Sequence, residues 1–86
     1  MPVVKLYASL RKLAGTKELF ISGSTIGDVL NGLVKQNPAL DGTIFEDRRV
    51  RHHFVITING HNVADLDALV TDQDIVAIFP PIAGGC

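Results

Sequence analysis

Cysteine and tryptophan are scarce in this chain: its 86 residues include one cysteine, Cys86, and no tryptophan. A single thiol cannot form an internal disulfide, so neither a disulfide framework nor a cysteine-rich zinc site is available. Such a chain suits a reducing compartment, and we expect a cytoplasmic location. The sequence has no charged leader before an apolar run, and no apolar stretch near the ~20 residues that span a bilayer, so we expect neither secretion nor a membrane partner.

A strong excess of either charge is also missing. Eight Lys and Arg residues oppose nine Asp and Glu residues, which gives a formal net charge of -1. A nucleic-acid binder needs a basic face to gain affinity from counterion release, so we expect no nucleic-acid partner. The chain contains no internal repeat or linker, and its 47% hydrophobic residues are enough for one small core.

Two strand signals open the chain. The segment from Val3 to Leu10 is rich in β-branched, aromatic and other apolar residues and predicts a buried strand. Gly15-Thr16 marks a turn, and Glu18 to Ser22 predicts a second strand. We therefore expect an antiparallel hairpin with a long connection.

The hydrophobic pattern then changes to the period of a helix. Apolar residues recur at i, i+3, i+4, i+7 and i+8, as they do on one face of an amphipathic helix: Ile26, Val29, Leu30, Leu33 and Val34. Thr25 followed by Asp28 resembles a capping box, and Asn37-Pro38 ends the helix because proline disfavours helical geometry at the preceding residue. Beyond it, one short helical turn is indicated by Leu40, Ile44 and Phe45.

The second half predicts a hairpin and a closing strand. Phe54 to Ile58 and His61 to Val63 are joined by Asn59-Gly60, which is typical of a type I′ turn because both central positions need positive φ. After a polar turn at Thr71 to Asp74, the near-continuous apolar run Ile75 to Phe79 predicts a central strand buried on both faces. This order indicates an α+β fold, with a mixed sheet of about four to five strands and one main helix packed across it.

The end of the chain is its most informative segment. Pro80-Pro81 follows the closing strand and directs the chain stiffly away from the sheet. Gly84 and Gly85 carry no Cβ, so they can lie extended in a narrow cleft where any side chain would clash. We therefore predict a domain over residues 1–82 and a flexible Gly-Gly-Cys tail over residues 83–86.

Two long segments carry a resemblance to a known family. They are Lys5 to Thr16 (KLYASLRKLAGT) and Leu69 to Gly85 (LVTDQDIVAIFPPIAGG), with the amphipathic helix between them. Together they resemble the MoaD/ThiS family of ubiquitin-like, β-grasp sulfur carriers. The likeness spans nearly the whole chain, and its most specific part is Phe-Pro-Pro combined with a terminal Ala-Gly-Gly. It points both to the small subunit of molybdopterin synthase and to the sulfur carrier of cysteine biosynthesis.

The resemblance implies that the chain is a carrier and not an enzyme. In that family, an ubiquitin-activating-like partner uses ATP to adenylate the terminal glycine, here Gly85, which is then converted to a thiocarboxylate. No Gly-x-x-x-x-Gly-Lys loop is present to cradle phosphates, so we expect ATP to be bound by the partner and no cofactor by this chain. The sulfur would pass to a large molybdopterin synthase subunit or to a cysteine synthase. The alternative is a ubiquitin-like modifier that is joined through its C-terminal glycine to lysines of other proteins.

Cys86 departs from the usual Gly-Gly end of the family. Three interpretations remain open. Cys86 is a short extension that a zinc metalloprotease removes to expose Gly85, or it is the coded equivalent of a carrier-cysteine adduct, or it is incidental. The residues around it do not mark its thiol as an activated nucleophile. The first interpretation makes the full chain a precursor.

Five residues are candidates for partner docking: Tyr7, Arg11, Phe79, Pro80 and Pro81. Core packing of the two rings and ordinary solvation of the arginine are the competing interpretations.

A basic cluster occurs in the second half of the chain: Arg48, Arg49, Arg51, His52 and His53. It either docks an acidic surface or is a solvated loop. Adjacent histidines on a strand point to opposite faces, so we expect no metal site.

Overall fold

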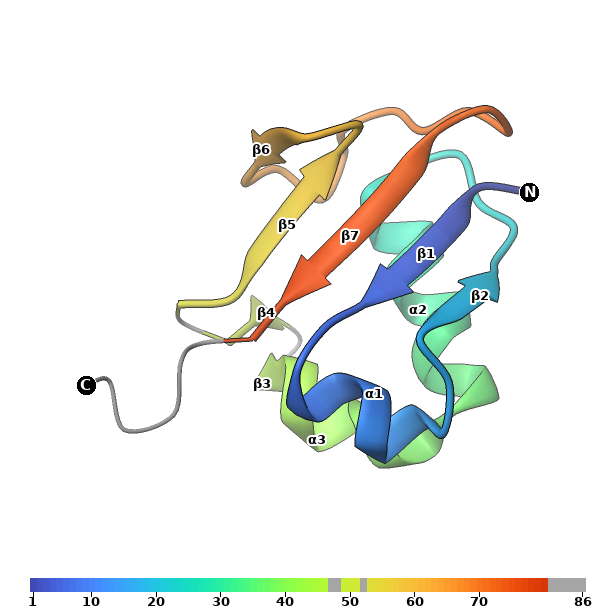
Figure 1. Ribbon diagram of the computed structural model, residues 1–86. Coiled ribbons are helices and arrows are strands. Elements are labelled where there is room, and N and C mark those ends of the chain that lie inside the picture. Colours follow the sequence, from blue (N-terminus) through green and yellow to red (C-terminus); the bar gives the residue numbers. More distant parts are fainter. Residues whose placement is uncertain (47–48, 52, 81–86) are drawn as a thin grey trace.

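The computed structural model describes residues 1–46, 49–51 and 53–80, and its centre is a five-stranded mixed sheet (Figure 1). The strand order is β2-β1-β7-β5-β6. Central β7 runs parallel to β1 and antiparallel to β5, and both β2 and β6 pair antiparallel to their neighbours. The strands are β1 (Val3–Leu6), β2 (Glu18–Phe20), β5 (Val55–Ile58), β6 (His61–Val63) and β7 (Ile75–Phe79). The expected mixed sheet and the central position of the closing strand are confirmed.

The predicted helix is α2 (Ile26–Gln36), which covers one face of the sheet. At its start, the Asp28 N–H donates to Thr25 Oγ1 at 3.1 Å. The Asp28 carboxylate accepts from the Ser24 N–H at 3.3 Å, one residue before the position that a capping box would use. The first contact satisfies a backbone donor that the first helical turn leaves unpaired, and the second ties the residue before the N-cap to the helix.

The core lies between α2 and the sheet. Ile26, Val29, Leu30 and Leu33 are buried on the helix side, whereas Val34 is only partly buried at the edge of the core. On the sheet side, alternate residues of each strand point inward, as the pleat requires. These inward residues include Val4, Leu6, Ile56, Val76 and Ile78, all buried, and Ile58, which is partly buried.

Two predictions for the first hairpin are corrected. The opening strand ends at Leu6, and the expected strand residues Ala8 to Leu10 lead into a helix, α1 (Ser9–Ala14). The segment is helical because Leu10 and Ala14 share a face that packs on the core, while Arg11 and Lys12 remain in solvent. Gly15 ends this helix with φ 74, a left-handed conformation that glycine adopts without strain. The second strand also ends earlier than expected, at Phe20.

The closing strand is central but is not buried on both faces. Val76 and Ile78 are fully buried against α2, and Ala77 is buried on the opposite face. Ile75, which shares that opposite face, is 41% exposed. No helix covers this side of the sheet in the described part of the chain (Figure 1). The continuous apolar run of this strand therefore does not reflect burial on both faces.

Short elements connect α2 to β5. They are the 3-10 helix η1 (Pro38–Leu40), α3 (Asp41–Ile44), β3 (Phe45–Glu46) and β4 (Arg49–Val50). The short helical turn predicted here is confirmed, because Leu40 and Ile44 are fully buried under it. Phe45, expected in the same turn, instead begins the β3-β4 hairpin.

The β5-β6 turn has the predicted type I′ signature. Asn59 and Gly60 have φ values of 52 and 85.

Among the described residues, no helix is long and apolar enough to cross a bilayer.

Candidate functional site

The predicted tail begins where central strand β7 ends. Because β7 is parallel to β1, and Leu6 lies opposite Ile78, the next residue of each chain segment, Tyr7 and Phe79, reaches the same end of the sheet. Tyr7 therefore lies beside Phe79, the last residue of β7. Pro80 follows Phe79 and is partly buried. The topology thus brings an aromatic pair to the root of the tail.

The two aromatic rings are stacked. The Tyr7 and Phe79 ring centroids are 4.5 Å apart, and the ring planes differ by 14°. The Arg11 guanidinium carbon lies 5.0 Å from the Tyr7 centroid, within the range of a cation-π contact. Three of the five predicted docking residues thus form one cluster, which we call the tail-root stack: Tyr7, Arg11 and Phe79.

Helix α1 positions the charge of this stack. It begins two residues after Tyr7 and brings Arg11 back over the ring, where Arg11 Nε donates to the Leu6 carbonyl at 2.7 Å. This bond and the ring contact restrict a side chain that is otherwise flexible. Both rings are half-buried while Arg11 is exposed, so the stack offers a firm apolar surface with one fixed positive charge.

The remaining tail predictions lie outside the described residues. These are Pro81, Gly84, Gly85 and Cys86, together with Arg48 and His52 of the basic cluster. The domain limit at residue 82 also lies outside. The structure therefore defines the surface from which the tail leaves, and the roles of the tail residues stay predictions.

The described part of the basic cluster lies in and after β4. Arg49 is exposed, and Arg51 Nε donates to the Gly42 carbonyl at 2.9 Å. His53 has φ 71, so the chain turns there and does not continue as a strand. Over residues 1–46, 49–51 and 53–80, no group of three or more His, Cys, Asp or Glu residues could hold a metal ion.

Sequence reasoning missed two features near these sites. One is helix α1, for which the i, i+4 spacing of Leu10 and Ala14 and the following Gly15 were usable signals. The other is a cavity beside β4, whose lining residues are separated along the chain and show no local motif.

Comparison with known proteins agrees with the fold. The ThiS family model matches residues 4–85, nearly the whole chain. The chain belongs to the ThiS family. Its β-grasp fold, with ubiquitin-like relatives, confirms the resemblance seen in the sequence.

Three relatives show the range of this family. Small archaeal modifier protein 3 of Haloferax volcanii is 35% identical, over 95% of this chain and 96% of the relative. The molybdopterin synthase sulfur carrier subunit of Arabidopsis thaliana is 36% identical, over 95% of this chain and 80% of the relative. The solution structure of small archaeal modifier protein 1 from Methanosarcina acetivorans is 40% identical and has a TM-score of 0.87, over 96% of this chain and 94% of that one. Carriers and modifiers are thus both similar to this ThiS family chain.

Proposed function

We propose that this ThiS family chain is a sulfur carrier that works in the cytoplasm through the carboxylate of Gly85. A partner enzyme binds ATP and transfers AMP to this carboxylate with release of pyrophosphate. A sulfur donor then displaces AMP and leaves a thiocarboxylate, which passes its sulfur to molybdopterin or cysteine biosynthesis. The chain supplies reach and recognition, and the partner enzymes supply catalysis.

The tail-root stack is the observation that supports this proposal most strongly. It lies at the end of the central strand, directly before Pro80, so a partner that grips it holds a fixed point from which the tail extends. An extended chain spans ~3.3–3.6 Å per residue, so the five residues from Pro81 to Gly85 reach about 17 Å from this point. This reach suits an active site that lies well inside the partner. The same partner surface would contact Tyr7, Arg11 and Phe79.

Docking variants test this role of the stack. We expect Tyr7→Ala and Phe79→Ala to reduce adenylate formation about tenfold or more, since buried aromatic anchors are typical hot spots that contribute 2 kcal/mol or more to binding. Lys12→Ala changes a neighbouring exposed cation outside the stack and is the matched control. The adenylate is measured with saturating ATP while the carrier concentration is varied. Equal loss in the control, or no loss in the stack variants, would contradict docking at this surface.

Cys86 defines a second test. A cleft shaped for a glycine end excludes a cysteine side chain, and Cys86 displaces the carboxylate by one residue, ~3.5 Å. Reacting atoms must lie about 3–3.5 Å apart in aligned geometry, so the chain ending at Cys86 should not be activated. We propose that a zinc metalloprotease trims it. Equal adenylation of chains ending at Gly85 and at Cys86 would show that Cys86 is incidental.

A protein modifier is the second candidate function. The names of two similar relatives, small archaeal modifier proteins 1 and 3, favour it. It requires the same activation of Gly85 but ends in an isopeptide bond to a lysine of another protein. The two functions therefore differ in the product and not in the activated end.

A further inference from the structure

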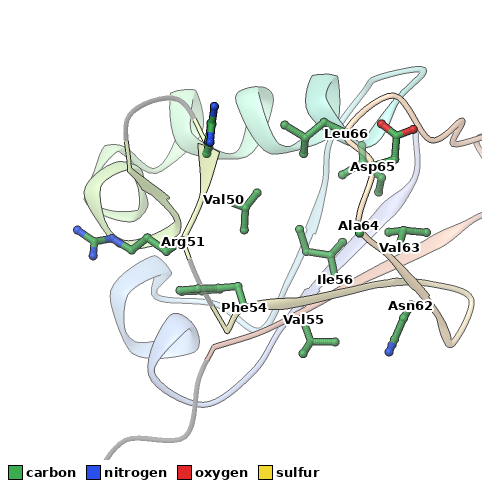
Figure 2. A pocket seen from close by; sticks show the side chains of 12 residues that line it. Val50, Arg51, Phe54, Val55, Ile56, Asn62, Val63, Ala64, Asp65 and Leu66 are labelled. Carbon is green, nitrogen blue, oxygen red and sulfur yellow. The ribbon is translucent and has the colours of Figure 1, made fainter.

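An apolar cavity of about 570 Å³ opens beside Arg49 and Arg51 (Figure 2). Apolar side chains from four parts of the chain converge on it, among them Val50, Ile56, Val63 and Leu66. Its volume falls within the ~300–1,000 Å³ typical of ligand sites. The cavity is thus large enough to take one or two side chains of another molecule.

One border of the cavity is an open sheet edge. Strand β6 is the last strand of the sheet and lines the cavity through Asn62 and Val63. In a hairpin with a two-residue turn, the pair that closes the turn, here Ile58 and His61, exchanges hydrogen bonds, and the next pair does not. The next pair is Thr57 with Asn62, so the backbone N–H and C=O of Asn62 point to the open edge. An added strand would pair with these groups.

The opposite border carries positive charge. Arg49 and Arg51 line the cavity from the β4 side, and both are exposed. Arg51 is anchored through Nε to Gly42, which leaves the terminal nitrogens of its guanidinium as donors. Asp65 lies at the β6 end of the rim, and its carboxylate accepts from the Asp67 N–H at 2.9 Å. Figure 2 shows the Arg51 side chain directed away from the cavity, so Arg49 supplies the positive charge of the β4 rim.

The cavity and the β6 edge beside it form one surface, which we call the groove. We propose that the groove binds an extended segment of a partner protein in which an apolar residue neighbours an acidic one. The segment would pair with the backbone of Asn62, insert its apolar side chain between Val50 and Ile56, and place its carboxylate at Arg49. Strand addition supplies affinity through main-chain bonds, and the pocket supplies specificity. The proposal thereby gives the basic cluster, through Arg49, a role that the sulfur-carrier proposal does not give it.

The apolar floor of the groove and the tail-root stack lie on different faces of the sheet, and Val55, which also lines the cavity, is paired with Phe79 where the two surfaces come nearest. Ile56 points to the α2 side of the sheet, whereas Phe79, which lies opposite Val55, points to the other side, because side chains alternate along strands. A partner at the groove therefore leaves the tail accessible to an activating enzyme. A scaffold or delivery protein could hold the carrier in this way during sulfur transfer.

Titration with synthetic peptides, followed by ¹⁵N NMR on the full chain, tests the proposal. The probe is a capped hexapeptide of alternating isoleucine and aspartate, and the control replaces each aspartate by lysine. We expect saturable shifts at Asn62, Val63 and Val50, and binding of the control at least fivefold weaker. Equal binding of the two peptides, or the absence of shifts at Asn62, would overturn the proposal. The same holds if octanoate binds as tightly as the probe without shifting Asn62, because the site would then be a small-molecule pocket.

Variants separate the parts of the groove. Arg49→Glu should weaken probe binding about threefold to fivefold, as expected for reversal of one exposed charge. Asn62→Pro removes the outward N–H without removing a ladder bond to β5, and should abolish binding. Lys12→Glu on α1 is the control and should bind as wild type. A chain ending at Pro80 should also bind normally, which separates this proposal from the function of the tail. If Asn62→Pro does not fold, the Arg49→Glu result decides, and wild-type affinity in that variant would refute the anion rim.

Discussion

A single turn residue, Asn59, connects two distant parts of the chain. Its side-chain Nδ2 donates to Asp74 Oδ1 and its Oδ1 accepts from the Ile75 N–H, both at 2.9 Å. The Asn59 N–H donates to the Ile75 carbonyl at 2.8 Å. Asparagine thus serves the turn twice, through its tolerance of positive φ and through these bonds. They hold the start of β7, the strand that carries the tail, in register with β5.

The carboxylate of Asp74 gives a pH-dependent prediction. Bonds from the Thr71 N–H and the Asn59 amide favour the ionised form and hold the pKa of Asp74 below its ordinary value of 3.8. Because the folded-state pKa is lower than the unfolded one, the stabilisation is complete above the unfolded value and is lost as pH falls through the folded value. We expect the difference in unfolding free energy between wild type and Asp74→Asn to shrink as pH falls below about 4.

Urea denaturation between about pH 2.5 and 6 measures this difference. Asp67→Asn removes a carboxylate from the preceding loop and controls for the general loss of one negative charge. A difference for Asp74→Asn that stays constant over the whole range would contradict the account.

Ala8 stores backbone strain beside the tail-root stack. Its φ of 54 and ψ of -129 lie in a region that residues with a Cβ rarely adopt. Ala8→Gly should therefore raise the free energy of unfolding by about 0.5–1 kcal/mol, after the entropy that glycine gains in the unfolded chain is subtracted. Lys12→Gly, within α1, should instead cost about 1 kcal/mol. Thermal or urea unfolding measures the stability of both variants, and a loss of stability in Ala8→Gly would contradict backbone strain at Ala8.

At the scale of elements, α2 was predicted and α1 was missed. Five apolar residues at helical spacing, a cap and a stop signal all agree for α2, so its type and face follow from the sequence. Around the start of α1, the apolar residues Tyr7, Ala8 and Leu10 continue the strand signal of β1, and tertiary packing of Leu10 then favours the helix. The burial of the closing strand was overestimated because Ile75 is apolar yet exposed.

Leu30 tests the predicted core of α2. It is fully buried in the hydrophobic core between α2 and the sheet, so Leu30→Ala should reduce the free energy of unfolding by ~2–5 kcal/mol. The matched change in the same helix is Asn31→Ala at an exposed position, which should be neutral or slightly stabilising. An unchanged denaturant midpoint for Leu30→Ala would remove the residue from the core.

Gly32 shows where packing overrides helix propensity. A Cβ on Gly32 would lie 2.7 Å from the Ile21 Cγ2 methyl, and Ile21 is itself buried. Alanine gains about 1 kcal/mol over glycine in a helix, but overpacking a core costs ~1–3 kcal/mol. We expect Gly32→Ala to be destabilising by about 1 kcal/mol on balance. Two double variants test the cause. With Ile21→Val the γ-methyl remains, so Gly32→Ala should still be destabilising. With Ile21→Ala the methyl is gone, so Gly32→Ala should no longer be destabilising.

At the scale of the whole molecule, the proposals give separate roles to the tail-root stack, the groove and the tail. The tail-root stack was foreseeable in its residues, since Tyr7, Arg11 and Phe79 were docking candidates, but their stacking depends on the parallel pairing of β1 with β7. The groove beside β6 was not foreseeable, because its lining residues meet only in the folded chain. The proposed function assigns activation to the tail, and the proposed groove offers a second partner a site whose apolar floor lies on the other side of the sheet.

The intact mass of the chain ending at Gly85 tests the central claim most directly. The chain is incubated with ATP, the adenylating enzyme of the same organism and a sulfur source, with omission of ATP as the control. The account predicts an ATP-dependent mass gain equal to the exchange of one oxygen for one sulfur, confined to the C-terminal peptide. An unchanged mass, or transfer of the whole chain onto lysines of other proteins without a thiocarboxylate, would contradict the sulfur-carrier function.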